Sequence, residues 1–284
     1  MHYVGKPGAF TPNPVYAGHN QGFTQAALVD HTSGSVHTDL CIAQLDSGGS
    51  LPPHLHAYEV GFYILSGQAV ALINDQTYRF GPGDYGCLKV GTLHAWRNAG
   101  STPLRWLRMA APQPKPLGME RDTFFQRDGS APADGSPLDP GDPKGSLLGH
   151  FDESQIPPGD EGRMVSGGLK GVFLKWLIDE KFGAIHHRLL FIEYLPGVGI
   201  GPHDHTYEEA YFILSGEVEA VLDGRRYLAK AGDVLWTGTN CVHAFRNISS
   251  EPVRWLETFS PQPPRENVFR FFAEWEQKGK EIEG

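Results

Sequence analysis

Cysteine is scarce in this sequence. Its 284 residues include only Cys41, Cys87 and Cys241, and none of them lies in a Cys-x-x-Cys motif. Three cysteines cannot all pair within one chain, and a disulfide framework or a cysteine-based metal site requires more of them. The sequence therefore predicts a reduced, cytoplasmic protein.

Clustered positive charge and long apolar runs are also missing. Asp and Glu (33) outnumber Lys and Arg (24), which gives a formal charge of −9. A nucleic-acid-binding surface needs clustered cations, and a membrane-spanning helix needs about 18 consecutive apolar residues. Residues 1–7 lack the basic, apolar and small-residue regions of a signal peptide. We expect neither nucleic acid nor a membrane as a partner.

Glycine (35) and proline (22) are abundant and make up about a fifth of the chain. Short aromatic and aliphatic runs at 62–65 and 211–214 each end at Ser-Gly, and residues 218–222 lead into Asp223-Gly224, a strong hairpin signal. Short strands separated by glycine-rich turns indicate an all-β sandwich, jelly roll or barrel.

One helix is expected, at the C-terminus. Its apolar face is predicted from the i, i+3, i+4, i+7 spacing of Val268, Phe271, Phe272 and Trp275. Such a face would pack onto a barrel or onto a second copy of the chain.

The sequence repeats itself after 149 residues. Residues 48–114 align without a gap to 197–263, with 26 identities in 67 positions. Solenoid repeats have units of about 20–50 residues, so each copy here must be a whole domain. The sequence is therefore that of a duplicated domain.

The composition between the two copies indicates where they divide. Pro, Gly and Asp fill 12 of the 18 positions from 128 to 145, a composition typical of irregular surface connections. We therefore expect a first domain at 1–116, a connection at 117–165 and a second domain at 166–284.

Histidines occupy equivalent positions in the two copies. Within each copy the middle and last of them are 38 residues apart; they are His54, His56 and His94 in the first copy and His203, His205 and His243 in the second. Alternate residues of a strand face the same side, so the two imidazoles of a His-x-His can converge on one ion. Glu209 has the same parity as His205 if the strand continues. Three imidazoles and a carboxylate leave open positions on Fe, Mn, Ni or Zn.

These motifs resemble those of the cupin family, so the chain looks like a bicupin with two tandem cupin barrels (double-stranded β-helix, or jelly roll). The first cupin motif is matched in full in the second copy by Gly197, His203, His205, Glu209 and Gly216. The second motif is matched at Gly232, His243 and Asn247, with departures at Gly238 and Asn240. The resemblance implies one divalent metal per site, with Fe(II) or Mn(II) favoured and Ni or Zn also compatible.

The first copy departs from the motif at one ligand. Val60 replaces the motif glutamate, and the adjacent Glu59 aligns with Glu208 and should face the opposite side of its strand. Two readings follow: a weaker three-histidine site, or an empty site kept for folding. We therefore expect loss of Glu209 or His243 to abolish activity and most metal binding, and loss of His94 to do less.

Four further residues are candidates for lining the pockets. Tyr58 and Tyr207 each lie two residues beyond the second histidine of the first motif and share its face. Trp236 and Cys241 lie within the second motif of the second copy and are candidates for lining the second pocket. No catalytic acid or base can be assigned from the sequence.

Three functions fit a histidine-bound ion inside a small barrel. The first is a mononuclear dioxygenase acting on a small oxygen-bearing organic substrate. The second is a non-redox metal enzyme: a decarboxylase, isomerase, lyase or aminohydrolase. The third is a non-catalytic protein that binds a metal or small ligand. The resemblance also implies a homodimer, since cupins pair their barrels edge to edge.

Overall fold

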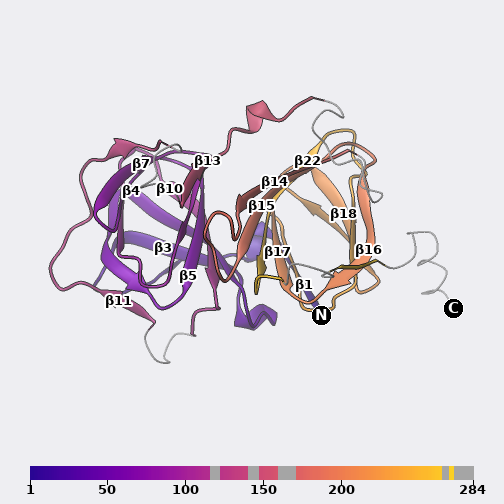
Figure 1. Ribbon diagram of the computed structural model, residues 1–284, viewed down its shortest axis with the longest axis horizontal. Helices are drawn as coiled ribbons and strands as arrows, with labels where there is room; N and C mark the ends of the chain where they lie inside the picture. The colour runs from indigo at the N-terminus through magenta and orange to yellow at the C-terminus, as the bar shows by residue number, and fades with distance from the viewer. Residues whose placement is uncertain (116–121, 140–146, 159–170, 264–268, 272–284) are drawn as a thin grey trace.

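Two β-barrels lie side by side in the computed structural model (Figure 1), which describes residues 1–115, 122–139, 147–158, 171–263 and 269–271. The tandem all-β architecture is confirmed. The helices of the described residues are single 3₁₀ turns: η1 (Pro7–Ala9), η2 (His31–Ser33) and η4 (Glu153–Gln155). Within these ranges, no helix is long and apolar enough to cross a membrane.

The first barrel is built on one long, bent strand, β4, which pairs with β3, β9, β10 and β11. Its strands are β2 (Asn13–Pro14), β3 (Gln21–Val29), β4 (Asp39–His56), β5 (Glu59–Ser66), β6 (Ala69–Ile73), β7 (Gln76–Phe80), β8 (Asp84–Leu88), β9 (His94–Asn98), β10 (Leu104–Ala111), β11 (Thr123–Phe125), β12 (Ser136–Pro137) and β13 (Leu148–His150).

The second barrel consists of two sheets, with strand orders β1-β20-β17-β22-β15-β14 and β19-β18-β21-β16-β23. Its strands are β1 (His2–Gly5), β14 (Val172–Ile178), β15 (Arg188–Tyr194), β16 (Gly199–His205), β17 (Glu208–Ser215), β18 (Glu217–Leu222), β19 (Arg225–Lys230), β20 (Val234–Thr237), β21 (His243–Arg246), β22 (Val253–Ser260) and β23 (Phe269–Phe271).

The two barrels exchange strands. Strand β1 comes from the start of the chain but pairs with β20 of the second barrel, with Val4 opposite Leu235. Strand β13 precedes the second copy but pairs with β8 of the first barrel, with Leu148 opposite Gly86. Figure 1 accordingly shows the N-terminus at the base of the second barrel. Each barrel is therefore completed by a segment outside its own repeat.

Three apolar cores stabilise this arrangement. One fills the first barrel around Phe62, Trp96 and Trp106, and another fills the second barrel around Tyr211 and Trp255. The third lies between the barrels and takes side chains from both, among them Leu40, Tyr63, Leu107 and Met109 from the first and Leu189, Phe191, Phe212 and Trp236 from the second. Because this third core is continuous, the two barrels pack as one body.

Two buried glutamates hold the barrels together in a reciprocal way. Glu208 of the second barrel accepts hydrogen bonds from the backbone N–H groups of residues 36–38 in the first barrel, at 2.9–3.3 Å, and from the Ser35 hydroxyl at 2.6 Å. Glu59 of the first barrel accepts the equivalent bonds from residues 185–187 of the second, at 2.9–3.3 Å. Glu59 also accepts a bond from the His187 ring, at 2.8 Å. It thus faces away from His54, His56 and His94, as strand alternation predicts.

Two glutamines support the loops that meet these carboxylates. The Gln113 amide donates to the carbonyls of Ser35 and Thr38, at 3.2 and 2.8 Å. Gln262 makes the equivalent bonds to Ala184 and His187, at 2.8 and 3.2 Å. These contacts explain why Pro-Gln-Pro recurs at the end of each repeat.

The prediction of a C-terminal helix is wrong at Phe271, the one residue of the predicted apolar face that lies within the described residues. Phe271 lies in strand β23, opposite His203 of β16. The edge of β16 offers unpaired backbone groups that a strand satisfies and a helix cannot. Val268, Phe272 and Trp275 lie outside the described residues.

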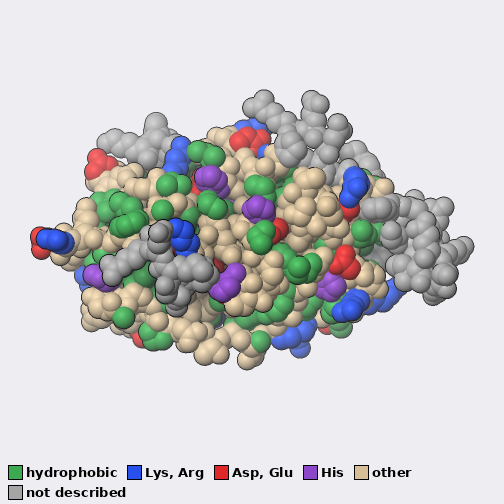
Figure 2. Space-filling view, turned by 90° about the horizontal axis from the view of Figure 1, so that it is seen from below, with side chains coloured by type: hydrophobic (Ala, Val, Ile, Leu, Met, Phe, Trp, Pro, Cys, Tyr) green, Lys and Arg blue, Asp and Glu red, His purple; other side chains and the backbone are tan. Residues whose placement is uncertain are grey.

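Charged side chains are dispersed over the face seen in Figure 2. Lys, Arg, Asp and Glu lie there singly or in small mixed groups among apolar and uncharged residues. This face presents no block of one sign that would suit a polyanion.

Removing one interdomain carboxylate should destabilise the protein. We expect Glu208→Ala to lower the free energy of unfolding by about 3 kcal/mol, because four donors that are now bonded to a charged group lose their acceptor. Urea denaturation measures this change. The control Glu251→Ala removes an exposed carboxylate and should cost less than about 0.5 kcal/mol. Equal losses in the two variants would contradict a role for Glu208 in joining the barrels.

Candidate metal centres

Three buried histidines meet inside the first barrel. His54 and His56 lie at the end of β4, and His94 begins β9, where it pairs directly with His54. One ring nitrogen from each lies within 4.8 Å of the others, and the His54 and His94 ring centroids are 4.0 Å apart. The pleat of the bent strand β4 places both of its histidines on the inner face.

Each imidazole of the first barrel is oriented by a hydrogen bond at Nδ1. His54 donates to the Pro52 carbonyl and His94 to the Thr92 carbonyl, both at 2.8 Å, and His56 bonds to the Thr123 hydroxyl at 2.9 Å. A bond at Nδ1 leaves the Nε2 lone pair for a metal. Burial lowers the pKa of all three rings, that of His94 to about 4, so neutral imidazoles are present near pH 7. These three side chains fit a divalent metal.

The second barrel repeats the arrangement and adds a carboxylate. His203 and His205 lie on β16, and His243 of β21 pairs with His203. Their Nδ1 atoms donate to the carbonyls of Gly201, Tyr207 and Cys241, each at 2.9 Å. Glu209 of β17 places a carboxylate oxygen 2.8 Å from His205 Nε2 and 3.3 Å from His243 Nε2. The donor set of three imidazoles and one carboxylate fits a divalent metal.

The ionisable side chains of the second site have pKa values shifted in different directions. Burial lowers the pKa of His203 to about 3. Burial alone would also lower the pKa of His205, but the Glu209 carboxylate raises it above its usual value. Burial opposes ionisation of Glu209, and His205 outweighs it, so the pKa of Glu209 lies well below its usual value. Glu209 is therefore an anion here, and Tyr211 donates a hydrogen bond to it.

In the first barrel, Val60 occupies the motif position that Glu209 has in the second. A charged residue of the opposite sign, Arg108, lies nearby. Arg108 of β10, equivalent in the repeat to Glu257, is buried and donates to Asp39 at 3.2 Å and to the Tyr58 hydroxyl at 2.7 Å. The Tyr58 hydroxyl also lies 3.3 Å from the Thr123 hydroxyl, which bonds to His56. A chain of polar contacts thus connects Arg108 to a metal-ligand candidate.

A cavity of about 430 Å³ at the mouth of the first barrel shares lining residues with the void beside the three histidines. Tyr16, Asp39, Tyr58, Arg108 and Thr123 are among its lining residues. Tyr16 and Arg108 also line a small void beside His54, His56 and His94. The cavity is within the size range of small-ligand sites, and its inner end is close to the three histidines.

The four predicted pocket residues have different surroundings in the structure, and only the two tyrosines lie against site histidines. Tyr58 and Tyr207 stack on His56 and His205, with ring centroids 4.6 and 3.9 Å apart, and Tyr58 lines the cavity. Trp236 is buried in the core between the barrels. The Cys241 thiol lies near His2 and Asp223 rather than among the site histidines. Burial raises the pKa of Cys241 to about 12, so its thiol is uncharged.

Sequence reasoning missed Arg108, Asp39 and Thr123. The repeat contained a signal for the first of these, because Arg108 aligns with Glu257, a reversal of charge within an otherwise similar strand. Asp39 and Thr123 lie outside the aligned repeat, and only the fold brings them to the barrel mouth.

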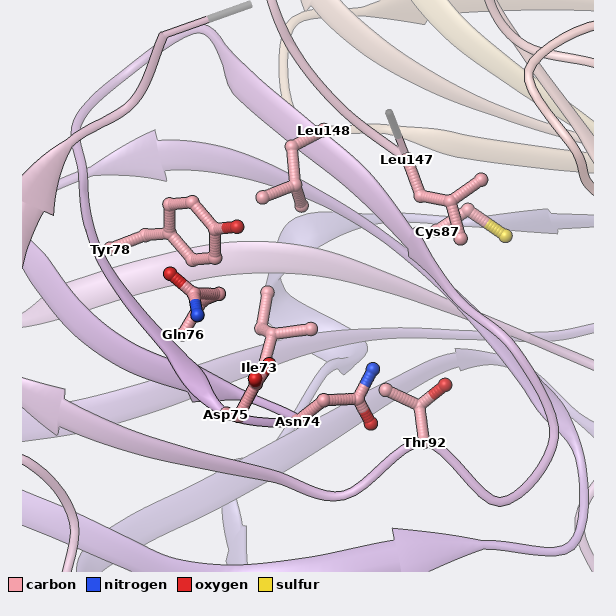
Figure 3. A pocket seen from close by; sticks show the side chains of 9 residues that line it. All are labelled: Ile73, Asn74, Asp75, Gln76, Tyr78, Cys87, Thr92, Leu147 and Leu148. Carbon is pink, nitrogen blue, oxygen red and sulfur yellow. The ribbon is translucent and has the colours of Figure 1, made fainter. Parts of the chain in front are cut away.

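A separate cavity of about 300 Å³ lies away from both histidine clusters. Figure 3 shows Ile73 and Tyr78, from strands β6 and β7, below Leu148 of β13. None of the metal-ligand candidates lines it, so it is not part of either centre.

Several known proteins are similar to this chain in sequence or in fold. Polyketide synthase CurC from Streptomyces cyaneus is 31% identical over 74 residues, covering 26% of this chain and 48% of that protein. The match thus spans about half the length of that relative. Among solved structures, salicylate 1,2-dioxygenase from Pseudoaminobacter salicylatoxidans superposes with a TM-score of 0.68 at 14% identity, covering 92% of this chain and 81% of that one.

Oxalate decarboxylase from Lactobacillus farciminis superposes with a TM-score of 0.65 at 14% identity, covering 99% of this chain and 93% of that one. Likeness at such identity establishes the fold and not the reaction. The cupin domain family itself matches the sequence twice, at residues 41–109 and 190–259, once in each barrel. Together with the duplicated histidine clusters, these two matches make the chain a bicupin, a member of the cupin family with two tandem cupin domains.

Proposed function

We propose that this bicupin is a metal-dependent dioxygenase that acts on a small oxygen-bearing organic substrate. The observation that carries the proposal is the set of three neutral, buried imidazoles beneath a small-ligand cavity in the first barrel. Fe(II), which suits imidazole ligands, would supply the redox chemistry with O₂. Salicylate 1,2-dioxygenase and oxalate decarboxylase, the two structural relatives described above, are both consistent with a bicupin metal enzyme.

The side chains around the first site are suited to this role. The carbonyls of residues 52 and 92 and the Thr123 hydroxyl fix the three imidazoles. Phe62, Trp96 and Trp106 surround them with apolar surface, which keeps bulk water away from reactive species. Tyr58 contributes a hydroxyl at the boundary between the cavity and the ligands.

A non-redox reaction is the second candidate, and Glu209 is the observation that favours it. A carboxylate ligand suits Mn(II) better than imidazoles alone do, and Mn(II) acts as a Lewis acid on a carboxylate or carbonyl. Such a reaction would belong to the second barrel.

The two barrels would then differ in their tasks. The sequence favours the second copy for activity because it has the complete ligand set. The cavity and Arg108 favour the first copy for substrate entry, and we place the dioxygenase reaction there. Glu209 would give the second barrel the tighter metal site. The small-molecule substrate, a homodimeric assembly and a cytoplasmic location remain proposals.

Metal analysis tests the proposal first. We expect protein purified without a chelator or His-tag to contain about one or two Fe per chain by elemental analysis, and to consume O₂ with one member of a catechol, salicylate and diketone panel. Turnover under argon with Mn would favour the non-redox enzyme. Metal binding without any turnover would favour a binding protein. No metal after anaerobic reconstitution would contradict both metal enzymes and leave a protein that binds a small ligand.

Paired variants locate the reaction. We expect His94→Ala to remove the first barrel's metal and lower turnover at least about 100-fold, because two imidazoles hold the ion poorly. Glu209→Ala should instead lower the metal content of the second barrel and preserve most turnover. Metal per chain and the initial rate are measured on the same samples. The reverse pattern, with turnover lost in Glu209→Ala alone, would place the reaction in the second barrel, as the sequence by itself suggests.

A further inference from the structure

We propose that the first barrel selects substrates with a carboxylate group, and that Arg108 anchors this group at the inner end of the cavity. The proposal rests on the proposed function in one respect, namely that the first barrel binds the substrate. It adds a substrate class and a specificity-determining residue that the histidine motif does not contain.

The first argument is the burial of the Arg108 charge. The side chain is 5% exposed, yet it lines both the mouth cavity and the void beside the histidines. A guanidinium carries five N–H donors in a planar fork. One nitrogen donates to Asp39 and another to Tyr58, which leaves donors for a further acceptor that reaches the same cavity.

The second argument concerns how Asp39 compensates that charge. Its contact with Arg108 is a single 3.2 Å bond rather than a bidentate pair. Burial raises the pKa of the Asp39 carboxyl to about 6 against the opposing effect of Arg108. The Asp39 side chain is also the more exposed partner, at 19% against 6%. A buried cation with a single, partly exposed counter-charge is stabilised by a second anion.

The third argument is the contrast between the barrels. Glu257 occupies the position of Arg108 in the second repeat. The second repeat thus has an acidic residue, and no cation, at this position. The second site also contains the anionic Glu209, where the first has Val60. With a divalent ion in each barrel, the surroundings of the first ion would therefore be the more positive, which suits an anionic substrate. The mouth cavity itself is lined by Asp30, Asp39 and Asp122 as well as by Arg108 and Lys115, so the attraction depends on Arg108.

The cavity is also suited to a small organic acid. At about 430 Å³ it is at the lower end of the range for small-ligand sites. Tyr16 and Tyr58 line it together with Arg108, so aromatic surface adjoins the cation. An acid with its carboxylate on Arg108 would lie beside the void that the three histidines line.

Titration calorimetry with a matched acid and amide tests the inference. The probes are salicylate and salicylamide, similar in shape but different in charge, added to metal-loaded protein. We expect native protein to prefer salicylate, and Arg108→Met to weaken salicylate binding about 10- to 100-fold while changing salicylamide binding little. Asp39→Asn should strengthen salicylate binding roughly threefold or more, because it removes a competing anion. A purely structural role for either residue would not give effects of opposite sign.

Controls separate this inference from the proposed function. Arg105→Met removes an exposed arginine from the same strand and should leave both affinities unchanged. Arg108→Lys keeps the charge and should be intermediate; if Arg108→Met does not fold, Arg108→Lys and Asp39→Asn decide. The inference is overturned if native protein binds salicylate no more tightly than its amide, or if the Arg108 and Asp39 variants match native. In either case, retained metal and O₂ uptake would leave the dioxygenase proposal standing.

Discussion

The alternation of side chains along a strand is the constraint on which this structure depends. Glu208 and Glu209 are neighbours in the sequence, yet one carboxylate faces the loop of the other barrel and the next faces the histidines. The same strand thus joins the two domains and supplies a metal-ligand candidate. A shift of one residue in its register would exchange these two environments and satisfy neither carboxylate. The metal site and the interface between the barrels therefore depend on the same register.

In the first barrel, the equivalent strand keeps the contact between the domains but not the carboxylate beside the histidines. Glu59 keeps the contact with the second barrel, while Val60 has no ligand to offer. The site retains three imidazoles, and the nearest new charge is the cation of Arg108. The two barrels thus have the same backbone and opposite electrostatics near their centres. Such a difference would let one fold hold two metal ions and present them to ligands of different charge.

Much of this could be predicted from the sequence. The repeat, the glycine-rich turns and the His-x-His spacing were sufficient for two all-β cupin domains and for the histidine clusters, because those signals are local or recur at a fixed distance. Arg108 and Asp39 could not be found this way, since a charged residue on a strand is usually solvent-exposed and only the fold shows its burial. The helix expected around Phe271 failed for a related reason: the pattern of side chains contains no information about the free edge of β16.

The exchanged strand β1 has a consequence for the order in which the chain can assemble. The partners of residues 2–5 in β20, residues 234–237, are made more than 200 residues after them. During synthesis the first barrel must fold with its leading segment still unattached, and that segment docks only when the second barrel is nearly complete. A second barrel produced alone would leave one edge of β20 unpaired, and an unpaired edge is a site for association with other chains. The two halves of this protein are thus repeats in sequence but not separable units in folding.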